Sequence, residues 1–458
     1  MTSTAASFDR RLLAPMILGS VLNPVNSSII AVALVPIAAA FGAPLQQTAL
    51  LVSSLYVATA IGQPLVGRLV DLFGPRRLFL LGTATTGVAG LIGAFAPALP
   101  VLVLARVVLG FGTCAGYPAS MVLIKREAGR TGQDSPAGVL TALAIATQTV
   151  AVVGPSLGGL LIDLGGWRAT FAVNVPLSIA GVLLGALILP RDGDVGGGLR
   201  GLLRLDWAGV ALFAGALVAL LAFLLGPHVA TLWLLGAAVV LGAAFALREL
   251  RTRDPFVDVR VLAHSRPLLA TYARAVLAAT VSYCFLYGFT QWLEDGRGLS
   301  PSVAGLVLLP TFGIGLLVSA TTGRRPEVRL KLLVGAIVQV GVAALLLGVG
   351  ADEPLWALLA IAALLGVPQG LVNLGNQNAL YAQADPAHLG ASAGLLRTFM
   401  YLGAILASSA SGLAFGARAD TGGLHALAVF MLAAAAPFAL LVVLDRSLAL
   451  VGRRPDLS

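Results

Sequence analysis

A short basic loop between two apolar stretches decides the fold of this chain. The loop reads Gly67-Arg68-Leu69-Val70-Asp71-Leu72-Phe73-Gly74-Pro75-Arg76-Arg77. Residues 46–66 before it and 78–97 after it are apolar over about 20 residues, the length of helix that crosses a lipid hydrocarbon core. The glycines allow a close helix approach and a tight reversal, and Asp71 can pair with a basic group. The pattern predicts two membrane-spanning helices joined by a short loop.

Composition extends this prediction to the whole chain. Of the 458 residues, 58% are hydrophobic and 11% are charged, whereas a soluble domain carries about 25% charged residues. The apolar runs do not alternate in polarity as barrel strands do, so helices must satisfy their backbone groups in lipid. We expect an all-α membrane protein with about 14 spans of ~20 residues each. The expected spans are residues 14–40, 46–66, 78–97, 100–124, 136–163, 169–189, 207–226, 229–247, 268–293, 301–322, 331–350, 354–380, 389–415 and 423–444.

The distribution of charge predicts the orientation of the chain. If the N-terminus is cytoplasmic, 23 of the 29 Lys and Arg residues lie in cytoplasmic loops, and Arg168, Arg297 and Arg418 lie on the opposite side. This asymmetry follows the positive-inside rule. It predicts a multi-pass protein of the cell (inner) membrane with both termini in the cytoplasm. The excess of arginine over lysine, with much Ala and Gly, points to a bacterial source.

Some partners and cofactors are not expected. The net charge of +9 is spread over short loops, so no nucleic-acid partner is expected. Cys114 and Cys284 lie inside apolar runs and the four histidines lack ligand spacing, so neither a metal nor another cofactor is expected. No phosphate loop or nucleophile constellation indicates an enzyme. The expected partners are the bilayer, a small-molecule substrate and, if transport is coupled to them, protons; the chain is expected to be a monomer.

An internal repeat divides the chain. A second basic loop, residues 323–331, follows span ten as the first loop follows span two. If the two loops correspond, residues 1–195 and 263–458 form six-helix halves, and residues 196–262 form an inserted two-helix hairpin. Two pseudo-equivalent halves that move about a central site are a recurring transporter architecture.

The first loop resembles the signature cytoplasmic loop of the major facilitator superfamily, whose pattern runs G-x-L-x-D-x-x-G-R-[RK]. Pro75 intervenes before the arginine pair, and Arg68 adds a charge. The resemblance implies the major facilitator fold, with two six-helix halves plus two inserted helices. It also implies a conformational latch between the halves on the cytoplasmic side, formed by Gly67, Arg68, Asp71, Gly74, Arg76 and Arg77.

Span five is similar to the antiporter motif of the same superfamily, which is associated with export. The motif residues are Gly154, Pro155, Gly158 and Gly159, followed by Gly165-Gly166-Trp167-Arg168. Small residues at this spacing let helices pack closely, and proline relaxes the helix. Because glycine and proline are common in membrane helices, close packing alone is the alternative interpretation.

Span one resembles the pattern D-x-T-[IV]-V-N-V-A-L-P of the fourteen-helix drug:proton antiporters. This chain reads Asn26-Ser27-Ser28-Ile29-Ile30-Ala31-Val32-Ala33-Leu34-Val35-Pro36, with Asn26 in place of the aspartate. An amide can hydrogen-bond a ligand but cannot carry a proton. No acid at mid-depth in another span replaces it. Proton coupling would therefore depend on outer acids such as Asp163 or on a group of the substrate.

Three arginines, Arg106, Arg274 and Arg397, fall within spans without an evident carboxylate partner. A centred arginine costs roughly 2.5–3.5 kcal/mol, so such a residue usually faces a cavity or a partner. The resemblance implies proton coupling for Arg106, and an anion contact is the alternative. Arg274 and Arg397 lie nearer the cytoplasmic end, where they can snorkel.

Polar side chains on several spans predict a wet central cavity. Four amides share one face of span twelve by i,i+3 and i,i+4 spacing. A single amide is best explained as a helix–helix contact, but four on one face favour a cavity. We expect a neutral, hydrogen-bonding and aromatic site with positive rims. The candidate substrate-binding or coupling residues are Asn23, Asn26, Arg106, Gln148, Tyr283, Tyr287, Gln369, Asn373, Asn376, Gln377 and Arg397.

These features favour a secondary active transporter that exports small organic, amphipathic or anionic compounds by alternating access, with proton coupling. The alternative is an uncoupled facilitator or exchanger of an anionic metabolite. A non-transporting membrane receptor is the third interpretation.

Overall fold

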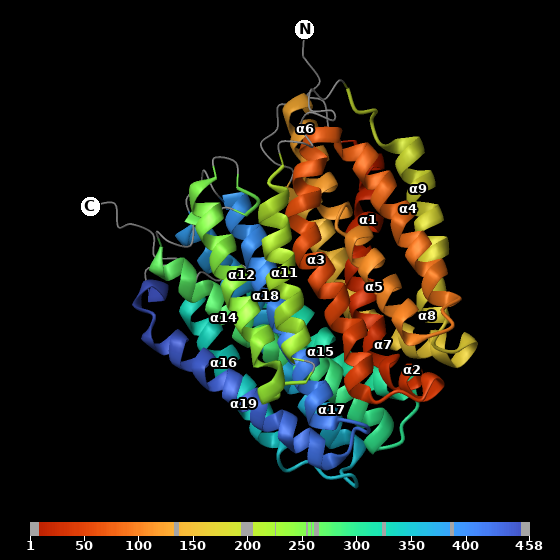
Figure 1. The fold of residues 1–458 in the computed structure, drawn as a ribbon, viewed down its shortest axis with the longest axis vertical. Coiled ribbons are helices and arrows are strands. Elements are labelled where there is room, and N and C mark those ends of the chain that lie inside the picture. Colours follow the sequence, from red (N-terminus) through yellow and green to blue (C-terminus); the bar gives the residue numbers. More distant parts are fainter. Residues whose placement is uncertain are drawn as a thin grey trace.

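The chain folds into a bundle of long helices (Figure 1). A computed structural model describes residues 9–131, 137–193, 205–224, 226–252, 255–257, 259–260, 265–322, 327–384 and 389–449, and within these ranges no strand occurs. Thirteen described segments are long and apolar enough to cross a membrane. Helix α7 (Ala137–Gly165) adds a further helix of 29 residues. The prediction of an all-α membrane protein with two six-helix halves and an inserted pair is confirmed.

The first six spans differ from the prediction by three breaks, of which the one at Val173 separates α8 from α9. The first span breaks at Ala33, and Pro36 then lies in the first turn of the new helix α2, where its missing N–H costs no helical hydrogen bond. The fourth breaks before Gly116, where the backbone passes so close to Gly19 that no Cβ fits. The elements are η1 (Arg10–Leu12), α1 (Leu13–Ile29), η2 (Ile30–Val32), α2 (Leu34–Phe41), α3 (Leu45–Phe73), α4 (Pro75–Ala94), α5 (Leu99–Thr113), α6 (Gly116–Thr131), α7, α8 (Ala169–Ala172) and α9 (Asn174–Ile188).

The last six spans contain one irregular helix. Span nine begins as an α-helix and ends in two π-helical turns, η4 and η5. Such turns widen the helix and are frequent at functional sites. The elements are α14 (Arg266–Cys284), η4 (Phe285–Phe289), η5 (Trp292–Gly296), α15 (Pro301–Thr322), α16 (Val328–Leu346), α17 (Leu355–Gln383), α18 (Leu389–Phe415), α19 (Thr421–Leu444) and η7 (Arg446–Ala449).

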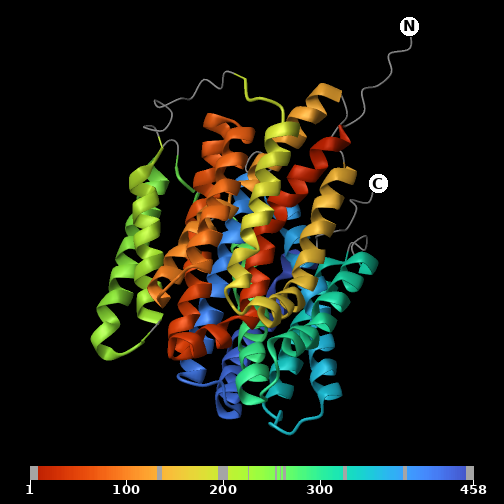
Figure 2. The same ribbon diagram turned by 90° about the vertical axis from the view of Figure 1, so that its right-hand side faces the viewer.

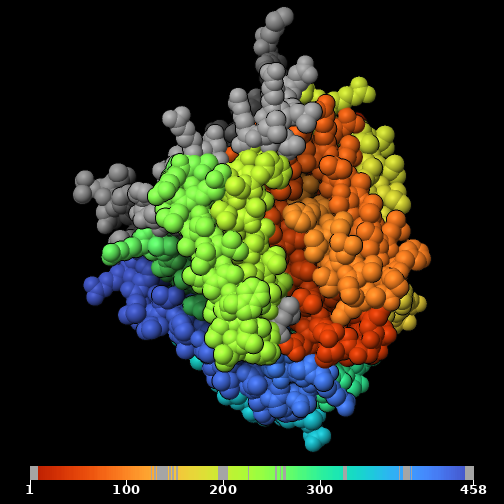
Figure 3. Space-filling view, in the orientation of Figure 1, coloured from red at the N-terminus to blue at the C-terminus, as the bar shows by residue number. Residues whose placement is uncertain are grey.

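The inserted hairpin lies at the periphery of the bundle. It consists of α11 (Trp207–Leu224), η3 (Val229–Thr231) and α12 (Leu232–Arg251). Helix α11 packs against α3 and α18, and Figures 2 and 3 show the light green pair on the outside of the molecule. Many of its large apolar side chains are exposed, including Trp233. The predicted boundaries of this hairpin, near residues 195 and 262, lie outside the described residues and stay predictions.

Two helix pairs, α3 with α18 and α7 with α15, join the two halves. We call the end of the bundle where α1 begins and α19 ends the terminal end, and the opposite one the far end. Many of the joining contacts lie toward the far end. Ser408 donates to the carbonyl oxygen of Ala49 at 2.8 Å, and the N–H of Gln46 donates to Gly416 at 3.1 Å. Ser302 of α15 donates to the carboxylate of Asp163 on α7. The far end is therefore closed.

Candidate functional site

Arg106 lies at the meeting point of three helices in the first half. It projects from α5 and is only 2% exposed. Its Nε donates to the carbonyl oxygen of Leu51 on α3 at 2.8 Å, and its Nη1 donates to that of Asn26 on α1 at 3.1 Å. Its Nη2 is buried without a hydrogen-bond partner among the described residues. None of the ion pairs found in the described ranges includes Arg106, so carbonyl groups take the place of a carboxylate.

The side chain of Asn26 is bonded to a second amide rather than to a ligand. Its Nδ2 donates to Oδ1 of Asn174 at 2.6 Å, and Nδ2 of Asn174 donates to Oδ1 of Asn26 at 2.8 Å. Both residues are buried. Because each amide satisfies the other, the pair ties α1 to α9. Asn174 is not among the candidate residues predicted from the sequence.

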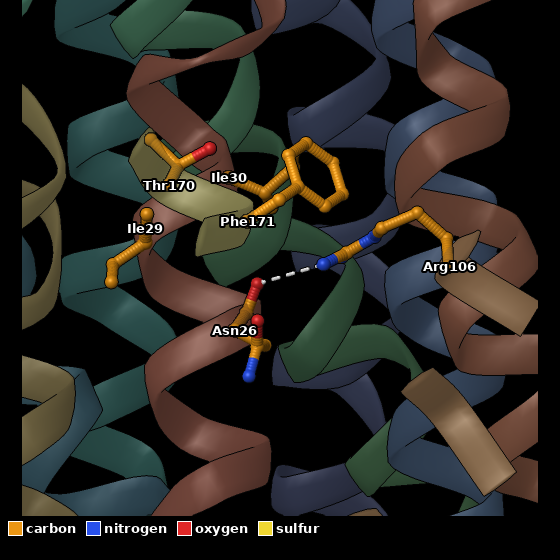
Figure 4. A pocket seen from close by; sticks show the side chains of 6 residues that line it. All are labelled: Asn26, Ile29, Ile30, Arg106, Thr170 and Phe171. Atoms are coloured by element: carbon orange, nitrogen blue, oxygen red, sulfur yellow. Dashed lines mark hydrogen bonds between the residues drawn. The ribbon is translucent and has the colours of Figure 1, made fainter. Parts of the chain in front are cut away.

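A small pocket lies beside Arg106 (Figure 4). Its empty space of about 180 Å³ is partly open to solvent and leaves room for about one water molecule. The pocket is therefore too small for a drug-sized compound. It suits a water molecule or a small ion that would meet the unpartnered guanidinium nitrogen. It is lined by Asn26, Ile29, Ile30, Arg106, Thr170 and Phe171.

Four tyrosines meet between the two halves. The hydroxyl of Tyr56 on α3 lies 2.9 Å from that of Tyr287 on η4, which donates to the carbonyl oxygen of Ser27 at 3.2 Å. The ring of Tyr56 lies 5.4 Å from the ring of Tyr283 and 5.4 Å from that of Tyr401 on α18. Tyr283 and Tyr287 were predicted from their shared helix face, whereas Tyr56 and Tyr401 were not. The one sign of Tyr56 and Tyr401 in the sequence is that each is a polar aromatic residue in the middle of a predicted span.

Arg397 joins this tyrosine cluster on its terminal side. Its guanidinium lies 4.2 Å from the centre of the Tyr117 ring, so a cation–π contact connects α18 to α6. Tyr117 is 36% exposed, and Arg397 is also exposed. This side of the cluster therefore lies toward the surface of the molecule, while Tyr56 and Tyr287 are almost fully buried. That Arg397 forms the positive rim of a substrate site stays a prediction.

The amide row on α17 is only partly enclosed. Asn376 is buried with its Oδ1 unpartnered, Gln377 is exposed and donates to Asn373 at 3.3 Å, and Gln369 is half-buried. Within the described ranges, no hydrogen bond joins this row to the tyrosine cluster. Elsewhere, Asn23 of α1 donates to Thr113 of α5 at 3.0 Å, which is a helix–helix contact. The side chain of Gln148 lies outside the described part of the structure.

Arg274 has the carboxylate partner that sequence analysis did not find. It is fully buried, and its Nη1 bonds Oδ2 of Asp445, just beyond α19. Its Nη2 donates to Thr271 at 2.6 Å. The pair is separated by 171 residues in the sequence, so chain proximity gave no sign of it. Arg274 holds α14 to the end of α19.

The antiporter motif lies where α1, α7 and α15 meet. A Cβ on Gly154 would overlap Ser28 of α1, and one on Gly159 would overlap Ser302 of α15. Ser156, between them, donates to the carbonyl oxygen of Gly305 at 3.1 Å. Gly159 therefore allows the two halves to touch near the far end, and Gly154 allows close packing within the first half.

The basic loop is organised by Asp192 rather than by Asp71. Gly74 has a φ of +95°, and the carboxylate of Asp192 packs against it. Asp192 accepts from the backbone N–H groups of Arg76 at 3.3 Å and Arg77 at 2.9 Å. Asp71 is exposed.

One residue of the predicted latch reaches outside the first half. Arg68 donates to the carbonyl oxygen of Pro255, which follows the inserted hairpin. Gly67 has open space where a Cβ would lie. Whether the six residues latch the halves together stays a prediction.

Two helical halves around a polar, tyrosine-lined centre, closed at one end, define a membrane transporter. The chain belongs to the major facilitator superfamily, because the model of the Major Facilitator Superfamily matches residues 16–408.

Relatives and solved structures agree with this assignment. The chain is 35% identical to the uncharacterized MFS-type transporter YwoD of Bacillus subtilis over 93% of this chain and 94% of that protein. It is 32% identical to the puromycin resistance protein pur8 of Streptomyces alboniger, over 74% and 68%. It is 28% identical to the tetracenomycin C resistance and export protein of Streptomyces glaucescens, over 89% and 76%. The nucleoside transporter NupG shares the fold, with a TM-score of 0.66 and 12% identity over 94% of this chain and all of that one.

Proposed function

We propose that this transporter exports small organic compounds, amphipathic or anionic, from the cytoplasm by alternating access driven by protons. The observation that carries the proposal is the tyrosine cluster with Arg397 at its surface-facing side, beneath a closed far end. Aromatic faces and a cation suit flat or anionic compounds. Within the described residues, no carboxylate contacts these tyrosines, so a cation would lack a counter-charge.

The proposed orientation follows from charge. The terminal end carries the basic loop of Arg68, Arg76 and Arg77, so we place it in the cytoplasm of a bacterium and the chain in the inner membrane. The surface-facing side of the cluster then faces the cytoplasm, where an exporter loads its cargo. Resistance and export relatives support this direction of transport.

Susceptibility profiling tests the proposal. Efflux-deficient bacteria expressing the chain would be challenged with puromycin, tetracenomycin C, aromatic organic anions and a permanent organic cation. We expect several-fold protection against members of the first three groups, and loss of protection in Arg397→Ala but not in Arg329→Ala, an exposed arginine at the terminal end. Unchanged susceptibility to every compound contradicts export.

A second candidate is exchange of an anionic metabolite without protons. The unpartnered Nη2 of buried Arg106 favours it, because that nitrogen can receive a small anion. Exchange predicts that unlabelled anion on one side of a vesicle accelerates movement of labelled anion from the other. Export predicts net accumulation that collapses with the proton gradient.

A further inference from the structure

Glu294 is a buried acid without a partner. It lies in η5, the second π-helical turn of span nine, and is 7% exposed. Neither oxygen of its carboxylate has a hydrogen-bond partner among the described residues. Its position in the sequence is one residue past the predicted span 268–293. The closed far end instead encloses it.

The position of Glu294 is set by its neighbours. Trp292 is fully buried and its Nε1 donates to Thr421 at the start of α19 at 3.2 Å. Asp295 accepts from Arg418 at 3.1 Å and from the N–H of Ala419 at 2.8 Å. Because Trp292 and Asp295 are both anchored at the beginning of α19 or in the loop just before it, the side chain of Glu294 between them is held inside the bundle.

No cation within the described ranges neutralises Glu294. The elements packed against η5 are η4, α15 and α19. The titratable group of η4 is Tyr287, and α15 contains no charged residue. The only titratable side chain of α19 is His425, which bonds the carbonyl oxygen of Val349 at 2.9 Å. In the adjoining loops, Arg418 is bonded to Asp295, Arg297 to the carbonyl oxygen of Ala351, and Asp420 caps α19 through Gly423. Asp163 of α7 is exposed and bonded to Ser302.

Polar side chains connect Glu294 to the central site. Gln291 lies one turn back on span nine, is 2% exposed, and its Oε1 also lacks a partner. Tyr287 lies a further turn back and touches Tyr56. A stripe of three polar groups therefore runs along span nine from the far end to the tyrosine cluster.

We propose that Glu294 is the group that binds the coupled proton, and that its protonation allows the far end to close. An ionised carboxylate buried without a partner costs several kcal/mol, whereas the neutral acid does not carry that penalty. When the far end opens, water reaches the carboxylate and external protons equilibrate with it. One proton binds one carboxylate oxygen, the far end closes over the neutral acid, and the proton later leaves along the polar stripe toward the cytoplasm.

This inference rests on the proposed direction of transport, and it supplies the acid that Asn26 cannot provide. It also explains why no acid at mid-depth is needed. The proton site and the substrate site are separate, and the far-end closure connects them.

Spin-label distances across the far end test the inference with pH as the only variable. Labels on Leu164→Cys and Trp356→Cys, both exposed at the far end of opposite halves, report its opening. The native Cys114 and Cys284 are buried. We expect the open-to-closed ratio to rise with pH, by up to about tenfold per pH unit for one linked proton. Glu294→Gln should stay closed at every pH, while the exposed-acid control Asp352→Asn should follow the wild type.

Further variants and a spectroscopic readout make the outcome decisive. Glu294→Asp should restore pH-dependent opening with a displaced midpoint, and the carboxylic-acid stretching band that appears on acidification should disappear in Glu294→Gln. A pH-independent wild type, an unchanged profile in Glu294→Gln, or an aspartate variant that restores neither signal would overturn the inference. Because no transported compound is used, failure of the susceptibility test would overturn the proposed function without affecting this result.

Discussion

The side-chain amides of Asn26 and Asn174 bond each other in both directions, at 2.6 and 2.8 Å, and thereby join α1 to α9. Asn26 stands where the drug:proton antiporter pattern has an aspartate. Here that position is part of the packing of the first half, and it neither carries a proton nor points a free group into a cavity. The position therefore packs α1 against α9, and a role for Asn26 in substrate binding or coupling stays a prediction.

Removing either member of this pair should destabilise the protein. Asn26→Ala and Asn174→Ala should each lower the free energy of unfolding by about 1–3 kcal/mol, because the remaining amide is buried without a partner. The double variant should cost less than the sum of the two single variants. Unfolding in detergent measures all four proteins, and simple additivity would contradict the pairing.

Replacing Arg106 should separate transport from folding. Arg106→Ala removes the side chain that bonds Leu51 and Asn26, so we expect the protein to insert but transport to fall at least about tenfold, as for the loss of a buried charged hydrogen bond. Arg106→Lys retains the positive charge but cannot reproduce both hydrogen bonds, to Leu51 and to Asn26. Its transport rate should therefore lie between those of the wild type and Arg106→Ala. Membrane abundance and transport are compared in the same cells. Full activity of the alanine variant would assign Arg106 to packing alone.

Enlarging Gly159 should prevent the far end from closing. Gly159→Val forces a side chain against Ser302, and overpacking of about 1–3 kcal/mol shifts the closed-to-open ratio by roughly 5- to 150-fold. Amide hydrogen exchange at residues 302–306 should accelerate. The control is Gly313→Val on α15, the helix that carries Ser302, because a Cβ at Gly313 meets nothing within 4 Å. Equal exchange in both variants would show that Gly159 does not limit closure.

Asp445→Asn should destabilise the second half. It leaves the fully buried Arg274 without its counter-charge, and breaking such a pair costs about 3–5 kcal/mol. Thermal unfolding measures this loss. Asp352→Asn, at an exposed position, should change the melting temperature little. Equal melting temperatures for the two variants would show that the ion pair does not stabilise the protein.

The same pair predicts a pH dependence. Burial raises the pKa of Asp445, but the bonds from Ser447 and Arg274 outweigh it and hold the pKa below its usual value. Its stabilising contribution is therefore complete above about pH 3.9, the ordinary aspartate pKa, and is lost as pH falls through the lower folded value. Asp445→Asn should lack this acid-dependent step in stability.

The architecture could be predicted because lipid imposes strict rules on a sequence. Span length follows from bilayer thickness, and the placement of Arg76 and Arg77 follows from the charge rule. The breaks at Ala33 and before Gly116 were missed, because both depend on which backbone lies next to the helix. Those contacts are not visible in a single span.

The site was only partly predictable for a related reason. Tyr283 and Tyr287 share a helix face that can be read locally, whereas Tyr56 and Tyr401 join them only after the halves assemble. Arg274 and Asp445 are likewise distant in sequence. Glu294 lies one residue past the predicted span 268–293, and the length of a span does not reveal that this carboxylate is buried in a π-helical turn.

Proton-driven transport into inverted membrane vesicles tests the central claim most directly. The vesicles expose the terminal end, and a proton gradient, acidic inside, is imposed before a compound from the susceptibility profile is added. We predict uptake against its concentration gradient, collapse of uptake when the pH gradient is dissipated, and failure of uptake in Glu294→Gln. Full uptake without a pH gradient would contradict proton-coupled export.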